Sequence, residues 1–185
     1  MNNMISTDNL RSRLIIAGLA ELERHGATDF SLRRVAKEAG VSCAAPYRHF
    51  KDKDDLIGAV IDYVLEGWTL LSGQLEAIFA SDTSALISEL AVAGLRFWIA
   101  NGNFRKVIMA SSAPSAEERG VLDGFEKPIK SAVSKYTAEQ SSEKADMLAF
   151  KILSMLYGAI ILVDGGYESA ENAAQSLKRA IISEL

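Results

Sequence analysis

Apolar residues recur along most of this 185-residue chain at intervals of three and four positions, a spacing typical of amphipathic helices. Glycine follows two of these segments, at Gly26 and Gly40, and Ser31 and Ser42 precede the next ones as good N-caps. Helices are therefore expected over residues 9–25, 32–39, 43–50, 52–80, 84–100, 104–110, 117–136, 143–164 and 168–185. The pattern predicts an all-α fold, in which three helices form an N-terminal group and about six form a C-terminal bundle.

One of the predicted helices, 143–164, carries apolar residues on more than one face. Ile152 and Met155 fall on one side, and Leu153 and Tyr157 fall on another. A helix that is apolar nearly all round has to be covered on both sides. This helix is therefore a candidate for contact with a second copy of the chain.

The composition is that of a folded globular protein, with 49% hydrophobic and 24% charged residues. The sequence has no uninterrupted run of about 18 apolar residues, so no membrane contact is expected. Its N-terminus lacks the apolar core of a signal peptide, and the protein is expected to stay in the cytoplasm. Cys43 is the single cysteine, which excludes an internal disulfide and a cysteine-rich zinc site.

The net charge of −4 is unevenly distributed along the chain. Residues 1–55 contain nine Lys and Arg against eight Asp and Glu, whereas residues 56–185 contain eleven against sixteen. Within residues 31–53, six basic residues stand against two acidic ones. A small basic patch on an acidic chain is typical of a DNA-binding segment joined to a domain that does not bind DNA.

The segment 40–60, GVSCAAPYRHFKDKDDLIGAV, combines features that suit entry into a DNA groove. Cys43, Ala44 and Ala45 are small, so the backbone of a helix that begins there can approach base edges and thymine methyl groups. Phe50 is expected to lie in the core of the three N-terminal helices. The segment therefore predicts a recognition helix with a nearly bare leading face.

Donors and cations accompany this bare face. Tyr47, His49 and Lys53 can donate to phosphates, and such contacts position a protein on DNA without reading its sequence. Arg33 is the first candidate for reading a base, most readily a guanine, and Arg48 is the second. These residue types together favour a DNA-binding function.

The order of these residues resembles the DNA-binding domain of the TetR-type (tetracycline-repressor-like) transcriptional regulators. The motifs FSLRRVAKEAGVS and YRHFKDKDDL carry the resemblance through Ser31, Ala36, Gly40, Val41, Ser42, Tyr47, His49, Phe50, Lys53 and Leu56. The resemblance implies a helix-turn-helix DNA-binding domain over residues 1–53 and a helical effector-binding and dimerisation domain over residues 54–185. The expected DNA-binding residues are Arg33, Ser42, Cys43, Ala44, Ala45, Tyr47, Arg48, His49 and Lys53.

For function, the resemblance implies a ligand-responsive regulator, a repressor that binds a palindromic double-stranded DNA operator as a homodimer. The last two helices of each chain are expected to form the dimer interface, with candidates Leu153, Tyr157, Ile160, Ile161, Leu177 and Ile181. A small apolar effector is expected among Trp68, Phe97, Trp98, Phe104, Met109, Phe125, Met155 and Tyr157. The effector would move the helix 52–80 and so change the spacing of two DNA-binding domains. Both sets also have a simpler interpretation as ordinary core.

No catalytic signature accompanies this pattern. The sequence contains no HExxH, GxSxG or glycine-rich phosphate loop, and Glu117 and Glu118 form a first-turn charge pair rather than an acid–base dyad. Arg34 and Lys37 are expected on a solvated face. The chain is therefore expected to have no enzymatic activity, no cofactor and no metal. An alternative is a TetR-like co-regulator that binds a protein partner in place of DNA.

Overall fold

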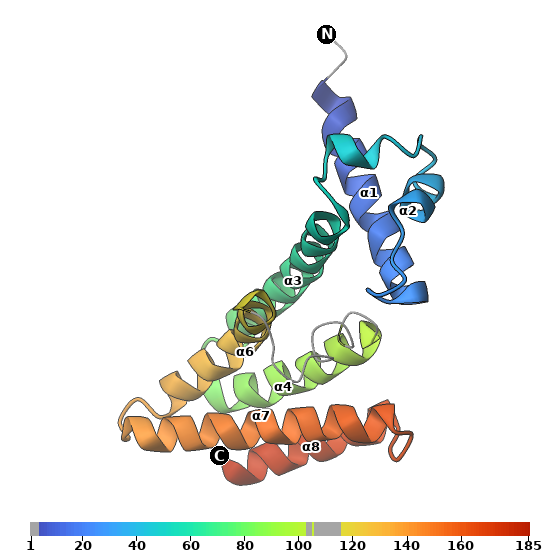
Figure 1. The fold of residues 1–185 in the computed structure, drawn as a ribbon. Coiled ribbons are helices and arrows are strands. Elements are labelled where there is room, and N and C mark those ends of the chain that lie inside the picture. Colours follow the sequence, from blue (N-terminus) through green and yellow to red (C-terminus); the bar gives the residue numbers. More distant parts are fainter. Residues whose placement is uncertain (1–3, 103–104, 106–115) are drawn as a thin grey trace. The chain divides into compact units, whose positions relative to one another are not determined.

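The computed structural model of the chain describes residues 4–102, 105 and 116–185. Its regular elements are helices throughout this part of the chain, which confirms the all-α fold class (Figure 1). They are α1 (Met4–His25), α2 (Leu32–Glu38), the 3₁₀ helix η1 (Pro46–Arg48), α3 (Lys53–Ile78), α4 (Thr83–Ala100), α6 (Ala116–Tyr136), α7 (Ser142–Asp164) and α8 (Ala170–Glu184). The helix predicted over 104–110 lies outside the described residues, apart from residue 105.

The described residues divide into two compact units. The N-terminal unit comprises the described residues up to Glu66, with residues 102 and 105, and the C-terminal unit comprises Gly67–Asn101 and the described residues from 116 onward. Helix α3 begins in the first unit and ends in the second. The functional division expected after residue 53 stays a prediction.

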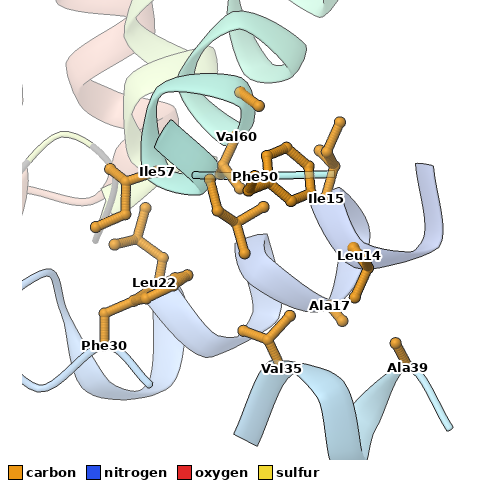
Figure 2. Packing of buried hydrophobic residues seen from close by; sticks show 12 residues of the cluster. Leu14, Ile15, Ala17, Leu22, Phe30, Val35, Ala39, Phe50, Ile57 and Val60 are labelled. Carbon is orange, nitrogen blue, oxygen red and sulfur yellow. The ribbon is translucent and has the colours of Figure 1, made fainter. Parts of the chain in front are cut away.

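The core of the N-terminal unit is built from side chains of α1, α2 and the start of α3 (Figure 2). Leu14, Leu22 and Val35 are fully buried in it, and their helical spacing is the reason that the sequence pattern locates this core. Helices α1 and α3 approach closely at Gly18, where a Cβ atom would lie 3.0 Å from Cγ2 of Val60. A larger side chain at this position would have to displace the neighbouring helix.

The C-terminal unit is organised around α4, which packs against α6, α7 and α8 (Figure 1). Aromatic rings fill its interior: the ring centroid of Phe125 lies 4.7 Å from those of Trp68 and Trp98 and 6.0 Å from that of Phe97. The indole Nε1 of Trp68 donates a hydrogen bond of 3.0 Å to the carbonyl of Phe125. Gly94 of α4 faces the same ring, since a Cβ atom there would lie 3.0 Å from Cζ of Phe125. Close aromatic packing therefore holds this unit together.

By length and composition alone, α3, α4 and α7 are long and apolar enough to cross a membrane, with mean hydropathies of 1.2, 1.3 and 1.8 over 18 residues. The sequence criterion counted uninterrupted apolar runs and therefore passed over helices that contain a charged residue. Half of the α4 segment is buried by its neighbours, against 22% of the α7 segment. Packing inside the unit thus accounts for the apolar character of α4, whereas α7 keeps apolar side chains exposed.

Candidate DNA-binding site

Helix α2 has a defined beginning and end. Ser31 has an extended backbone, and its hydroxyl accepts a hydrogen bond of 3.5 Å from the backbone N–H three residues on, as expected of an N-cap. At the other end the N–H of Val41 donates to the carbonyl of Ala36 and that of Gly40 to the carbonyl of Lys37, the two bonds of a Schellman motif. Gly40 has a φ of +66°, which glycine adopts without a Cβ clash. The chain therefore leaves α2 through a tight glycine turn.

The segment after this turn is tighter than the α-helix expected over 43–50. The N–H of Ala45 donates to the carbonyl of Ser42 at 2.9 Å, and the N–H of His49 donates to the carbonyl of Pro46 at 2.9 Å. Both bonds span three residues, and η1 is a single 3₁₀ turn. Pro46 is the physical reason, because it has no N–H with which to continue an α-helical ladder. The expected recognition α-helix is thus corrected to short turns with three-residue bonds, which end in one four-residue bond of 2.9 Å from the N–H of Phe50 to the carbonyl of Pro46.

The side chains of this segment divide by exposure. Tyr47 is 61% exposed, whereas Phe50 is buried in the core as expected. Ala45 is also buried, so its methyl group is not part of the exposed surface, contrary to the expectation that it faces a DNA groove. The guanidinium of Arg11 lies 5.3 Å from the ring centroid of Phe50, a cation that sequence reasoning missed because it is far from the motif in the chain. The surface defined by exposure consists of Ser42, Cys43, Ala44, Tyr47 and Arg48, with His49 half-buried beside them.

Three of the predicted DNA-binding residues supply positive charge. Arg33 in the first turn of α2 and Arg48 in η1 are exposed, and Lys53 is half-exposed at the start of α3. Within the described part of the chain, none of the three forms an ion pair. Their charge is therefore open to an anion such as a DNA phosphate.

Two aspartates fix the start of α3. The carboxylate of Asp52 accepts a hydrogen bond of 3.0 Å from the N–H of Asp55, and the carboxylate of Asp55 accepts one of 2.8 Å from the N–H of Lys51. The first bond satisfies a donor that the first turn of a helix leaves open, and the second attaches the residues before the helix to that turn. They hold the backbone on which Lys53 is carried.

Arg34 was expected on a solvated face, and the structure corrects this expectation. Its Nε donates a hydrogen bond of 2.7 Å to Oε1 of Glu21 on α1, and its terminal nitrogen lies 2.6 Å from the same oxygen. The N–H of Ser31 donates to that oxygen at 3.1 Å. The hydrogen bond with Glu21 is the largest contribution that raises the pKa of Arg34 above its ordinary value. The charge of Arg34 is therefore directed toward α1.

Two further polar contacts join α1 to α2. Arg24 forms an exposed ion pair with Glu38 at 3.1 Å, and its hydrogen bond lowers the pKa of the Glu38 carboxyl below its ordinary value. The guanidinium of Arg13 donates to the carbonyl of Ala39 at the end of α2. The short helix α2 is thus attached to α1 by polar groups at both of its ends.

The predicted effector-site residues fall into three groups. The four aromatic rings of the C-terminal unit contact one another directly and fill its interior. Met155 and Tyr157 of α7 are half-buried. Phe104 and Met109 lie outside the described residues. All of these assignments stay predictions.

A groove of about 860 Å³ lies between α6 and α7 within the C-terminal unit. Tyr157 lines it, and its hydroxyl donates a hydrogen bond of 2.8 Å to Glu126, which also forms an ion pair of 2.7 Å with Lys130. Burial first, and then the charge of Glu126, raise the pKa of Tyr157 above its ordinary value. The apolar part of the groove includes Phe150, Leu153 and Ile161. Tyr157 is thus a predicted ligand contact that the structure places at a cavity.

The dimer candidates differ in exposure. Ile161 is 65% exposed, and α7 also exposes Met147 and Phe150. Tyr157 is half-buried. The remaining candidates are buried within the single chain: Leu153, Ile160, Leu177 and Ile181. Sequence periodicity could not separate the two groups, because core and interface positions are both apolar.

A helix, a glycine turn and an exposed segment with free cations define the N-terminal unit as a helix-turn-helix DNA-binding unit. In the part of the chain that the structure describes, no group of three or more His, Cys, Asp or Glu residues is placed to hold a metal ion.

Residues 14–60 match the family described as bacterial regulatory proteins, tetR family, which supports the resemblance found in the sequence of the N-terminal unit. An HTH-type transcriptional regulator of Staphylococcus aureus is 34% identical over 77 residues, which cover 40% of this chain and 42% of that protein. The match thus spans less than half the length of that relative.

Two solved structures share the fold along nearly the whole chain. A TetR transcription regulator from Haloarcula marismortui has a TM-score of 0.76 at 19% identity, covering 96% of this chain and 98% of its own. The transcriptional regulator FadR from Bacillus subtilis in complex with stearoyl-CoA has a TM-score of 0.73 at 13% identity, covering 94% and 98%. At these identities the likeness concerns the fold.

Proposed function

We propose that this chain is a ligand-responsive, DNA-binding transcriptional repressor that acts in the cytoplasm as a homodimer on a palindromic operator. The exposed cations of the segment 42–53, together with Arg33, are the observation that supports DNA binding most directly. The family match over residues 14–60 covers this same segment. Two copies are proposed because a single helix-turn-helix unit contacts few bases.

The proposal divides the DNA-facing residues by role. Arg33 reads a base edge, because an exposed guanidinium in the first turn of α2 can bond a guanine at two positions. Tyr47, His49 and Lys53 contact phosphates and set the register of the protein on the duplex. Arg48 is exposed between them and serves as the second candidate for reading a base.

Fluorescence anisotropy with labelled duplexes at several salt concentrations tests this function. DNA binding requires an affinity that falls steeply with the logarithm of salt concentration, since bound cations release counterions. Arg33→Ala should cost about 1–3 kcal/mol on the preferred sequence and relax the preference, whereas Lys53→Ala should weaken all sequences alike and reduce the salt slope by about one. A flat salt response would favour the protein-binding co-regulator, and identical behaviour of the two variants would contradict the division into roles.

For the homodimer, the support is the exposed apolar face of α7. Met147, Phe150 and Ile161 lie on it, and the small residues Ser154 and Gly158 between them leave room for close approach of a second helix. Phe150→Glu should shift the chain toward monomer in sedimentation velocity. Lys127→Glu, an exposed change on α6, is the matched control and should leave the oligomeric state unchanged.

The effector is proposed to be a small, mainly apolar molecule, because the C-terminal unit offers aromatic and aliphatic surface with few polar groups. The stearoyl-CoA complex of the fold neighbour FadR supports a long acyl chain as the first class to test. A thermal-shift screen of fatty acids and acyl-CoAs should yield ligands that raise the melting temperature and weaken DNA binding. A screen in which none of these compounds stabilises the chain would contradict this part of the proposal.

A further inference from the structure

The carboxylate of Glu21 is an unusual group for a small helical unit, because it is buried and charged. Its side chain is 4% exposed, and one oxygen receives the Nε of Arg34, the terminal nitrogen of Arg34 and the N–H of Ser31 at 2.7, 2.6 and 3.1 Å. The other oxygen lies 3.8 Å from Nε2 of His25. A buried carboxylate is tolerated when such donors surround it. Glu21 therefore holds both the N-cap of α2 and the cation three residues further on.

The contact also determines where the charge of Arg34 points. Arg34 directly follows Arg33, the proposed base reader, and its side chain is 41% exposed. Its other acidic partner, Asp29, lies at 3.3 Å and is 72% exposed, so solvent screens that pair. Without Glu21, the Arg34 guanidinium would keep only this screened pair and its hydrogen bond to the backbone carbonyl of Asp29, and we expect it to turn outward. Two adjacent arginines would then be available to DNA in place of one.

We propose that Glu21 is a specificity-determining positioning residue, which acts by keeping Arg34 off the DNA and by fixing the first turn of α2 that carries Arg33. Phosphate contacts strengthen binding to every sequence alike, whereas base contacts discriminate among sequences. A released Arg34 would add a phosphate contact, and the loss of the Glu21 contact would loosen the geometry of the base contact made by Arg33. This inference rests on the proposed DNA-binding function.

The experiment compares variants of the full chain on two duplexes. One duplex is selected by the wild-type chain from a random-sequence library, and the other is a scrambled sequence of the same length and composition. Anisotropy titrations at several salt concentrations give the ratio of the two Kd values and the salt slope on the scrambled duplex. Glu21→Gln should lower the Kd ratio about fivefold or more, because a well-placed base contact is loosened. The same change should steepen the slope by about 0.9, the value for one additional phosphate contact.

Three further variants assign the effect to Arg34. Arg34→Gln should lower the Kd ratio without steepening the slope, because no cation is released. The double variant Glu21→Gln with Arg34→Gln should return the slope to the wild-type value. Arg24→Gln is the matched control, since it breaks an exposed ion pair between the same two helices and should change neither quantity. If Glu21→Gln fails to fold, Arg34→Lys serves instead, because it keeps the charge but loses the two-nitrogen contact and should steepen the slope.

The outcomes separate this inference from the proposed function. A wild-type chain that binds neither duplex contradicts both. A wild-type chain that binds both with a steep salt dependence supports the proposed function. In that case, a Glu21→Gln variant that loses affinity equally on both duplexes, at an unchanged slope, shows a purely structural role and overturns the inference alone. A double variant whose slope stays steep overturns it as well, because Arg34 would not be the released cation.

Discussion

The two units of this chain differ most in their cores, since both also have ion pairs between helices, such as Arg24 with Glu38 in the first and Lys178 with Glu89 in the second. In the N-terminal unit a small, mainly aliphatic core is accompanied by polar contacts between α1 and α2, at Glu21, Arg24 and Arg13. In the C-terminal unit four aromatic rings meet at centroid distances of 4.7–6.0 Å around α4. Hydrogen bonds have preferred directions, whereas apolar burial depends mainly on area. In the N-terminal unit, hydrogen bonds thus determine the orientation of the short helix α2. In the C-terminal unit, stability depends mainly on the apolar area that the packed rings bury.

This difference fits what each unit is proposed to do. A helix that presents Arg33 to a base edge must keep a defined direction, and seven residues are too few to hold a helix by themselves. The buried contact of Glu21 with Arg34 at the start of α2 and the hydrogen bond from Arg13 to Ala39 at its end supply that direction. A domain proposed to respond to an apolar molecule instead needs apolar surface whose packing can be rearranged.

Removal of an aromatic ring from the C-terminal unit should have the largest effect. Phe125 is fully buried and touches three other rings, so Phe125→Ala should lower the free energy of unfolding by about 3–5 kcal/mol. Urea denaturation followed by tryptophan fluorescence measures it, since both tryptophans lie in this unit. Tyr167→Ala is the control, because this ring is 81% exposed and its removal should cost much less. Equal losses for the two would mean that the aromatic interior is not what stabilises the unit.

Substitution of Gly40, the glycine in the turn after α2, should have the next largest effect. Gly40 has a φ of +66°, so Gly40→Ala should destabilise this unit by about 1–2 kcal/mol through the left-handed backbone alone. The nearest atom to the new Cβ belongs to the side chain of Arg13 at 3.6 Å, which is an ordinary contact. Hydrogen exchange at the N–H groups of α2 should accelerate. Gly40→Asn should show a smaller loss, because asparagine adopts this conformation more readily.

Sequence reasoning located the helices well and assigned side chains less well. Many helix ends follow from local turn and cap residues, such as Ser31 before α2, Asp82 before α4 and Ser169 before α8. The helices α2, α4, α7 and α8 lie within two residues of their predicted bounds. The 3₁₀ form of η1 was not predicted, since proline is also accepted in the first turn of an α-helix. The partner of Arg34 was not predicted either, because Glu21 is in the preceding helix and a contact between helices leaves no local pattern.

The buried positions show a second limit of the same kind. Leu177 and Ile181 have the periodicity of an interface helix, yet they are buried within the single chain, whereas Ile161 on α7 is exposed. One apolar stripe in a sequence cannot indicate which chain covers it. Only the packed structure shows which of these residues are exposed.

A smaller effect is expected from the one strongly perturbed phenol of the C-terminal unit. The hydroxyl of Tyr157 donates to Glu126 and its pKa is raised, first by burial, so it stays protonated when exposed tyrosines ionise. Tyr157→Phe should cost about 1 kcal/mol near neutral pH through the lost hydrogen bond. Because the folded pKa is above the unfolded value of about 10, this stabilisation is fully present below pH 10 and is lost as the pH rises further. Ultraviolet titration should show one late-ionising tyrosine that is absent from the variant, and unchanged curves would refute the assignment.

The smallest effect is expected at Glu38, and it tests whether all polar contacts of the N-terminal unit are alike. The hydrogen bond from Arg24 lowers the pKa of Glu38, so its stabilisation is present above the unfolded value of about 4.3 and is lost as the pH falls through the folded value. Both side chains are about half exposed, and salt at physiological concentration screens such pairs. Arg24→Gln should therefore change the acid limb of the pH–stability curve slightly at low salt and leave no measurable difference at high salt.

Arg34→Gln, which uncovers the buried Glu21 carboxylate, should instead destabilise the unit at both salt concentrations, because a buried charge has lost its main partner. If the stabilities of the two variants respond to salt in the same way, the buried ion pair of Glu21 contributes no more than the exposed pair of Glu38. The orientation of α2 would then depend on the mainly aliphatic core.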